Sequence, residues 1–129
     1  MPGDATADLI RALIDDLKGP EVDWDGWASM AIILEFPDGE FNEAHGYLYS
    51  PGGRISAVAS DPSAVRAAVN AYADGDYQLG HMLPRKILVQ FDRTTGRYDV
   101  TFEESDDARW KATPRNFREI REQLRPALG

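Results

Sequence analysis

Cysteine is absent from this chain of 129 residues, and histidine occurs only twice, at His45 and His81. The absence of cysteine excludes disulfides and thiolate chemistry, and it leaves the redox compartment of the protein open. Metal binding needs clustered ligands, and two histidines so far apart in the sequence form no recognisable cluster. We therefore expect no metal site and no cofactor.

Other signatures of chemistry are missing as well. Asp23, Asp25 and Glu35 do not fit a calcium-binding loop, because the position that must be glycine is Ala28. No serine stands in a Gly-x-Ser-x-Gly elbow, and no glycine-rich loop leads into a helix with Lys-Ser or Lys-Thr. These absences disfavour nucleophilic catalysis and nucleotide binding.

Long apolar runs are also lacking, which argues against a membrane-spanning helix. No basic residue precedes Arg11, unlike the charged start of a secretory signal. From these features and the length we expect a cytoplasmic protein that folds as a single domain over residues 1–129.

Negative charge, by contrast, is in excess. The net charge is −8, and residues 1–62 carry 12 acidic and 3 basic residues. Such a field repels nucleic acid and anionic membranes and attracts a basic partner. A protein with a basic surface is therefore the expected partner, although plain solubility would explain the same charge.

The clearest predicted element is a hairpin made from two runs, Lys86–Phe91 and Tyr98–Glu103. The first run is apolar and rich in β-branched residues, and the second alternates between apolar and polar residues. The turn between them contains Gly96, which can adopt a positive φ. The face of the second strand that we expect to be buried carries Tyr98, Val100 and Phe102.

Three further strands and three helices are predicted. The strands are Ala28–Phe36, Phe41–Tyr49 and Arg54–Ala59. The helices are an N-terminal one with an apolar stripe from Leu9 to Leu17, one from Asp61-Pro62 to Gly75, and one that opens at Thr113-Pro114. The order α-β-β-β-α-β-β-α predicts an α+β fold with a single layer of helices on a mostly antiparallel five-stranded sheet.

Acidic residues collect on and after the polar side of the hairpin's second strand, and Trp110 follows them. Acids around an aromatic ring suit a basic protein surface, because the acids guide approach and the ring holds contact. The segment around Trp24 has the same character. The candidate partner-binding residues are Asp23, Trp24, Asp25, Asp99, Glu103, Glu104, Asp106, Asp107 and Trp110. The alternative is an exposed sheet face with Trp110 tucked beneath it.

Aromatic and glycine residues recur at particular points in this order of elements. They are Trp24 and Trp27 before a strand, Gly46-Tyr-Leu-Tyr49, and a terminal hairpin of the form Phe91…Gly96-Arg97-Tyr98…Phe102. With these residues, the order of elements resembles the YezG-like family of bacterial immunity proteins. The resemblance implies a cytoplasmic antitoxin of a polymorphic toxin system that blocks a basic toxin domain, many of which are nucleases, without catalysis of its own.

Two other functions stay open at this stage. A small-ligand or regulatory binding domain would line a pocket on the sheet with His45, Tyr47 and Tyr49. A carboxylate-based hydrolase would need at least one of Glu43, Glu103 or Glu104 to be buried with a raised pKa.

Overall fold

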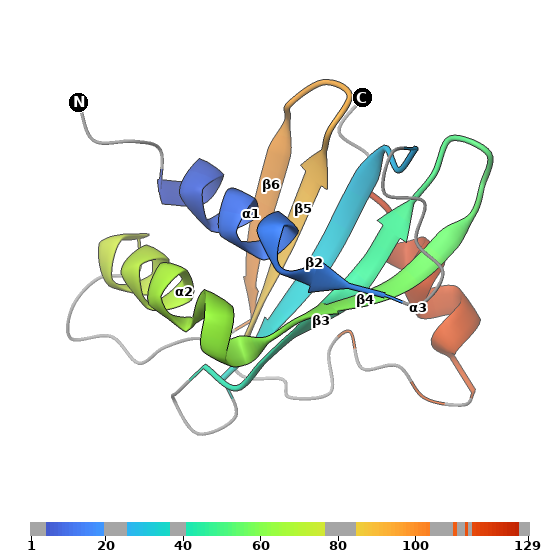
Figure 1. Cartoon of the computed structure of the whole chain (residues 1–129). Coiled ribbons are helices and arrows are strands. Elements are labelled where there is room, and N and C mark those ends of the chain that lie inside the picture. The colour runs from blue at the N-terminus through green and yellow to red at the C-terminus, as the bar shows by residue number, and fades with distance from the viewer. Residues whose placement is uncertain are drawn as a thin grey trace.

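The computed structural model describes residues 5–19, 26–36, 41–76, 85–103, 110, 113 and 115–126. Over these residues the chain forms three helices and one sheet of six strands, in the order β1-β4-β3-β2-β5-β6 (Figure 1). The helices are α1 (Ala5–Asp15), α2 (Pro62–Asp76) and α3 (Phe117–Gln123). The strands are β1 (Leu17–Lys18), β2 (Ser29–Glu35), β3 (Glu43–Tyr49), β4 (Ile55–Ser60), β5 (Lys86–Asp92) and β6 (Tyr98–Glu103). All neighbouring strands are antiparallel, which confirms the α+β class.

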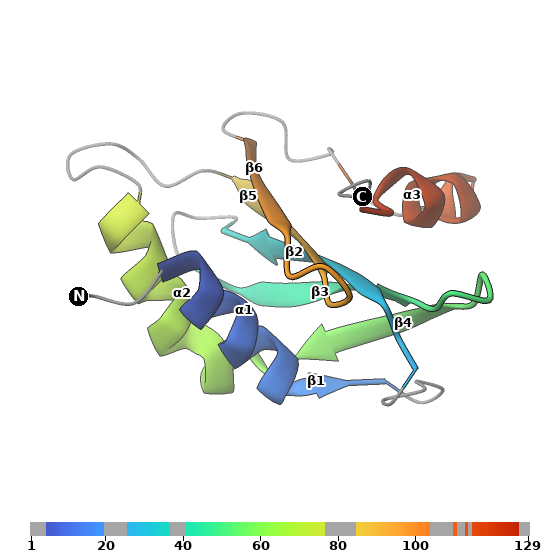
Figure 2. The same cartoon turned by 90° about the horizontal axis from the view of Figure 1, so that it is seen from above.

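The helices cover both faces of the sheet, so the prediction of a single helical layer is wrong. Figure 2 shows α1 and α2 on one face and α3 on the other. The alternation of side chains along β2 explains this arrangement: Ile32 and Leu34 pack in the core under α1 and α2, whereas Ala31 and Ile33 pack in the core under α3. A central strand that is apolar on both faces needs a cover on each.

The sixth strand, β1, replaces the last predicted turn of the first helix. Leu17 pairs with Ser60 of β4 instead of continuing the apolar stripe of α1. Two tertiary contacts compete with that turn. The Ser60 hydroxyl donates to the Leu13 carbonyl at 3.1 Å, and the Asp16 carboxylate accepts from the Asp61 amide at 2.6 Å. These contacts satisfy groups that a longer helix would have used, so the five-strand prediction misses one strand.

The third helix begins later than the sequence predicts. Asn116 folds its side chain back, and its Oδ1 accepts from both the amide (2.6 Å) and the hydroxyl (2.9 Å) of Thr113. Thr113 is thereby held in a turn before the helix rather than at its N-cap. Two apolar residues of this segment, Ile120 and Leu124, are nevertheless buried against the sheet.

The predicted hairpin is confirmed as β5 and β6, and Gly96 in its turn has a φ of +77°. Val100 and Phe102 pack against the core under α1 and α2, as expected. Tyr98 does not, because it lies next to the hairpin turn, at the end of the sheet, and is 39% exposed. Its side chain lines a hollow of about 260 Å³ between α1 and the hairpin turn.

Candidate functional site

Strand register places a row of charged residues across four neighbouring strands. Glu43 of β3 pairs with Glu35 of β2, Glu35 pairs with Lys86 of β5, and Lys86 pairs with Glu103 of β6. Directly paired residues point to the same face of a sheet. Ile33 and Leu88 lie two residues from Glu35 and Lys86 on the same strands, so they share this face, and they pack in the core under α3. The charged residues thus lie on the face that α3 covers, beyond the part that the helix reaches. We call Glu43, Glu35, Lys86 and Glu103 the acidic row.

Lys86 is buried within the acidic row, with 5% of its surface exposed. Its Nζ lies 3.7 Å from Oε1 of Glu35, whose side chain is 27% exposed. Burying an ammonium group is costly unless a carboxylate compensates it. The row therefore combines three carboxylates with one ammonium, which leaves it negative as a whole.

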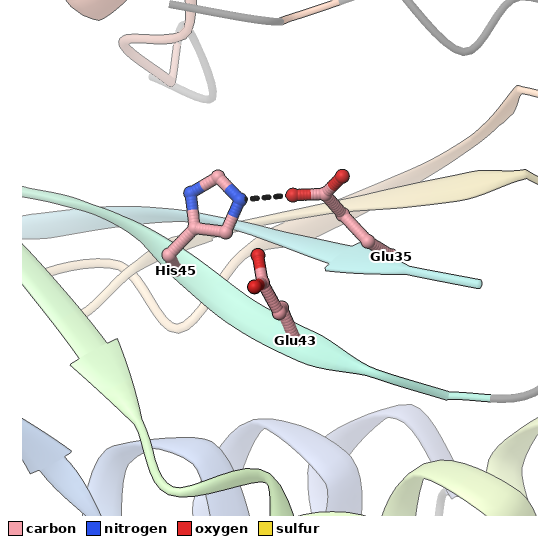
Figure 3. Close-up of side chains that lie close together, drawn as sticks. All are labelled: Glu35, Glu43 and His45. Atoms are coloured by element: carbon pink, nitrogen blue, oxygen red, sulfur yellow. Dashed lines mark hydrogen bonds and ion pairs between the residues drawn. The ribbon is translucent and has the colours of Figure 1, made fainter. Parts of the chain in front are cut away.

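His45 extends the acidic row along β3. Its Nε2 lies 2.5 Å from Oε2 of Glu35, so the two oxygens of Glu35 contact different cationic or donor groups. Figure 3 shows His45, Glu35 and Glu43 on the same side of the sheet, pointing away from the helices beneath it. The potential ligand atoms of these three residues all lie within 4.8 Å of one another. The fold thus brings together three possible metal ligands that the sequence does not group, and the expectation of no metal site stays a prediction.

A hollow of about 280 Å³ opens beside His45 and Glu43. Its other lining residues are Ala44, Ala59, Ser60 and Pro62. The site is thus a carboxylate and imidazole cluster with open space next to it.

The structure places two of the predicted partner-binding residues on the face of the acidic row. Glu103 belongs to the row itself. Asp99 lies four residues before Glu103 and pairs with Gln90, so it is on the same face of β6, where it is exposed. Glu104, Asp106 and Asp107 lie outside the described residues, as do Asp23, Trp24 and Asp25.

Trp110 lies inside the protein rather than at its surface. It is 6% exposed and packs in the core under α3, with a φ of +62°. Its burial corresponds to the alternative stated above, a ring tucked beneath the sheet face, and it leaves the ring no surface to offer a partner. Trp27 is likewise buried, at 3% exposure, with the Arg93 guanidinium 4.0 Å from its ring centre.

Sequence reasoning missed Glu35, Glu43 and His45 as one group. In the sequence they have separate candidate roles: Glu35 in the rejected calcium-binding loop, Glu43 in a hydrolase and His45 in a ligand pocket. The signal that could have joined them is the Pro37-Asp38-Gly39 sequence between the two predicted strands, because turn residues there favour a hairpin that brings Glu35 close to Glu43. The strand register then sets the two glutamates directly opposite each other.

The features required by the other two functions are only partly present. Tyr49 is buried, and its hydroxyl donates to the Arg121 carbonyl of α3 at 2.6 Å, so it does not line an open pocket with His45. Burial also raises the pKa of the Tyr49 phenol above its ordinary value. Glu43 is exposed and Glu103 partly exposed, whereas a hydrolase of the expected kind would bury one of them; Glu104 lies outside the described residues.

No protein-family model, curated protein or solved structure matches this chain. None of the helices in the described ranges is long and apolar enough to cross a membrane.

Proposed function

We propose that this protein is a non-enzymatic, cytoplasmic immunity protein that binds and blocks a basic toxin domain through the surface around the acidic row. The observation that supports the proposal is the register that brings Glu43, Glu35 and Glu103 to one end of one sheet face. The chain continues from Glu103 into Glu104, Asp106 and Asp107, which adds negative charge directly after the row.

The chemistry of a nuclease toxin suits such a surface. A nuclease must neutralise phosphates, so the rim of its active site is basic. An acidic surface that covers this rim excludes the nucleic acid and is itself attracted to the site over a distance. The sheet holds the carboxylates in fixed positions, which lowers the entropy lost on binding.

The carboxylates of the acidic row differ in how accessible they are to a partner. Glu43 is exposed and can meet a basic side chain directly, whereas Glu35 is partly covered and already shared between Lys86 and His45. We therefore expect Glu43 to dominate the interaction, with Glu35 keeping Lys86 neutralised.

The test uses the protein encoded by the neighbouring open reading frame as the candidate toxin and measures its binding in the presence of a metal chelator. Glu43→Lys should weaken binding about tenfold or more, which corresponds to about 1.4 kcal/mol. The new lysine would face Glu35 across the strands, a favourable pair that protects the fold.

The matched control is Asp8→Lys, which makes the same change of charge at an exposed position on α1. It should change the affinity by less than about threefold, because it weakens only the long-range attraction between the protein and its basic partner and removes no direct contact. Equal losses in both variants, or no complex with the wild type at low salt, would contradict the proposal.

A further inference from the structure

Glu35, Glu43 and His45 form a donor set of a kind that transition metals prefer. Imidazole nitrogen suits zinc, copper, iron and nickel, and carboxylate oxygens complete many zinc sites. We propose that these three residues bind one divalent transition-metal ion, with zinc as the best match. This proposal does not rest on the immunity function.

The geometry needs only small side-chain movements. In a tetrahedral zinc site, ligand atoms lie about 2.0–2.2 Å from the metal and therefore about 3.4 Å from one another. The three potential ligand atoms are within 4.8 Å of one another, and His45 Nε2 and Glu35 Oε2 are 2.5 Å apart. The ion would replace the hydrogen that lies between these two atoms. The Glu43 carboxylate, which is opposite Glu35 on β3, would move toward the ion.

The pairing of Glu35 with Glu43 is a second, independent reason to expect a cation. Two carboxylates directly opposite each other on neighbouring strands repel and destabilise the sheet. Among the described residues, Glu43 makes no ion pair that would offset this repulsion. A metal ion held between the two carboxylates would remove it.

Lys86 is the main argument against a cation at this position, and its geometry answers that argument. Its Nζ approaches Oε1 of Glu35 at 3.7 Å, on the oxygen that does not contact His45. It therefore fixes the orientation of Glu35 and leaves Oε2 directed at the imidazole, in the manner of a group that supports a metal ligand.

The exposure of the cluster provides room for the remaining coordination positions. The His45 side chain is 43% exposed and Glu43 is exposed, so water can reach an ion held between them. The site would thus resemble zinc centres with three protein ligands and at least one exchangeable position.

The test is calorimetric titration of the untagged full chain with zinc chloride. The wild type should bind one equivalent. His45→Gln and Glu43→Gln should each weaken binding about tenfold or more. Both side chains are at least partly exposed, so these substitutions spare the core, and thermal unfolding without metal should confirm that both variants are folded.

Two matched controls separate this site from adventitious binding. His81→Gln removes the other histidine, and Asp8→Asn removes an exposed carboxylate on α1; both should bind zinc like the wild type. NMR of the wild type gives a readout that needs no variant, because zinc should shift the imidazole resonances of His45 and not those of His81. Absence of one-equivalent binding, a shift at His81 alone, or undiminished binding in the Glu43 and His45 variants would overturn the proposal.

Discussion

Gly46 lies in the middle of β3, where the neighbouring backbone leaves no room for a side chain. It pairs with Ile32 on one side and Val58 on the other. A Cβ built at this position would lie 1.9 Å from the Ala31 carbonyl oxygen. Glycine is therefore required by the close approach of two strands rather than by a positive φ.

We predict that Gly46→Ala destabilises the protein by about 1–3 kcal/mol, because the clash is with the backbone and can be relieved only by moving strands. Urea unfolding measures the loss. Gly52→Ala is the control, since no described atom lies within 4 Å of its Cβ, and it should stay within about 0.5 kcal/mol of the wild type. Equal stability of the two variants would show that the strands separate easily at Gly46.

At the scale of elements, α3 is stabilised by its contacts with the sheet. Its seven residues are too few for a stable isolated helix. Two hydrogen bonds attach its C-terminal half: the Tyr49 hydroxyl donates to the Arg121 carbonyl at 2.6 Å, and Gln90 Nε2 donates to the Leu124 carbonyl at 2.8 Å. Ile120 and Leu124 add buried apolar surface.

The attachment of α3 predicts a specific loss of stability in alkali. Burial raises the pKa of Tyr49 in the folded state, so the folded protein keeps a proton that the unfolded chain releases above about pH 10. This contribution to stability is complete below that pH and is lost as the pH rises from there toward the folded pKa. The free energy of unfolding should fall by about 1.4 kcal/mol per pH unit from this group.

Tyr49→Phe should remove that part of the alkaline slope and should lower stability at neutral pH by about 1 kcal/mol, because the Arg121 carbonyl loses its donor. Urea unfolding at several alkaline pH values compares the variant with the wild type. Tyr47→Phe, a change in the adjacent and partly exposed ring, serves as the control. If the dependence of the unfolding free energy on alkaline pH is the same in Tyr49→Phe as in the wild type, the Tyr49 phenol of the wild type is accessible to solvent in the folded protein.

At the scale of the whole molecule, negative charge is in excess. The acidic row lies at one end of the sheet, and at the other end Arg93 and Arg97 of the hairpin turn are balanced by Asp92 and Asp99. The net charge of −8 and the acidic row together would attract a basic partner over a distance.

The excess of negative charge predicts that salt acts mainly on the rate of association with the proposed basic partner. Added salt screens exposed charges over about 10 Å at 0.1 M ionic strength, so the association rate should fall steeply as salt increases. The dissociation rate depends on close contacts and should change much less. Stopped-flow mixing over a range of salt concentrations measures both; an association rate independent of salt would exclude electrostatic steering.

Local pattern alone determined most of the secondary structure. The alternation in Tyr98–Glu103, the turn with Gly96 and the Asp61-Pro62 helix start are encoded within a few residues, and the structure contains each of them. These features are predictable because backbone geometry fixes which side chains share a face and which residues suit a turn.

Tertiary contacts decided the rest. Whether Leu17 continues a helix or joins β4 depends on Ser60 and Asp61, which lie more than forty residues away in sequence. The burial of Trp110 depends on where α3 packs. The cluster of Glu35, Glu43 and His45 exists only because strand register sets separate side chains opposite one another, and register is a property of paired strands that no single strand contains.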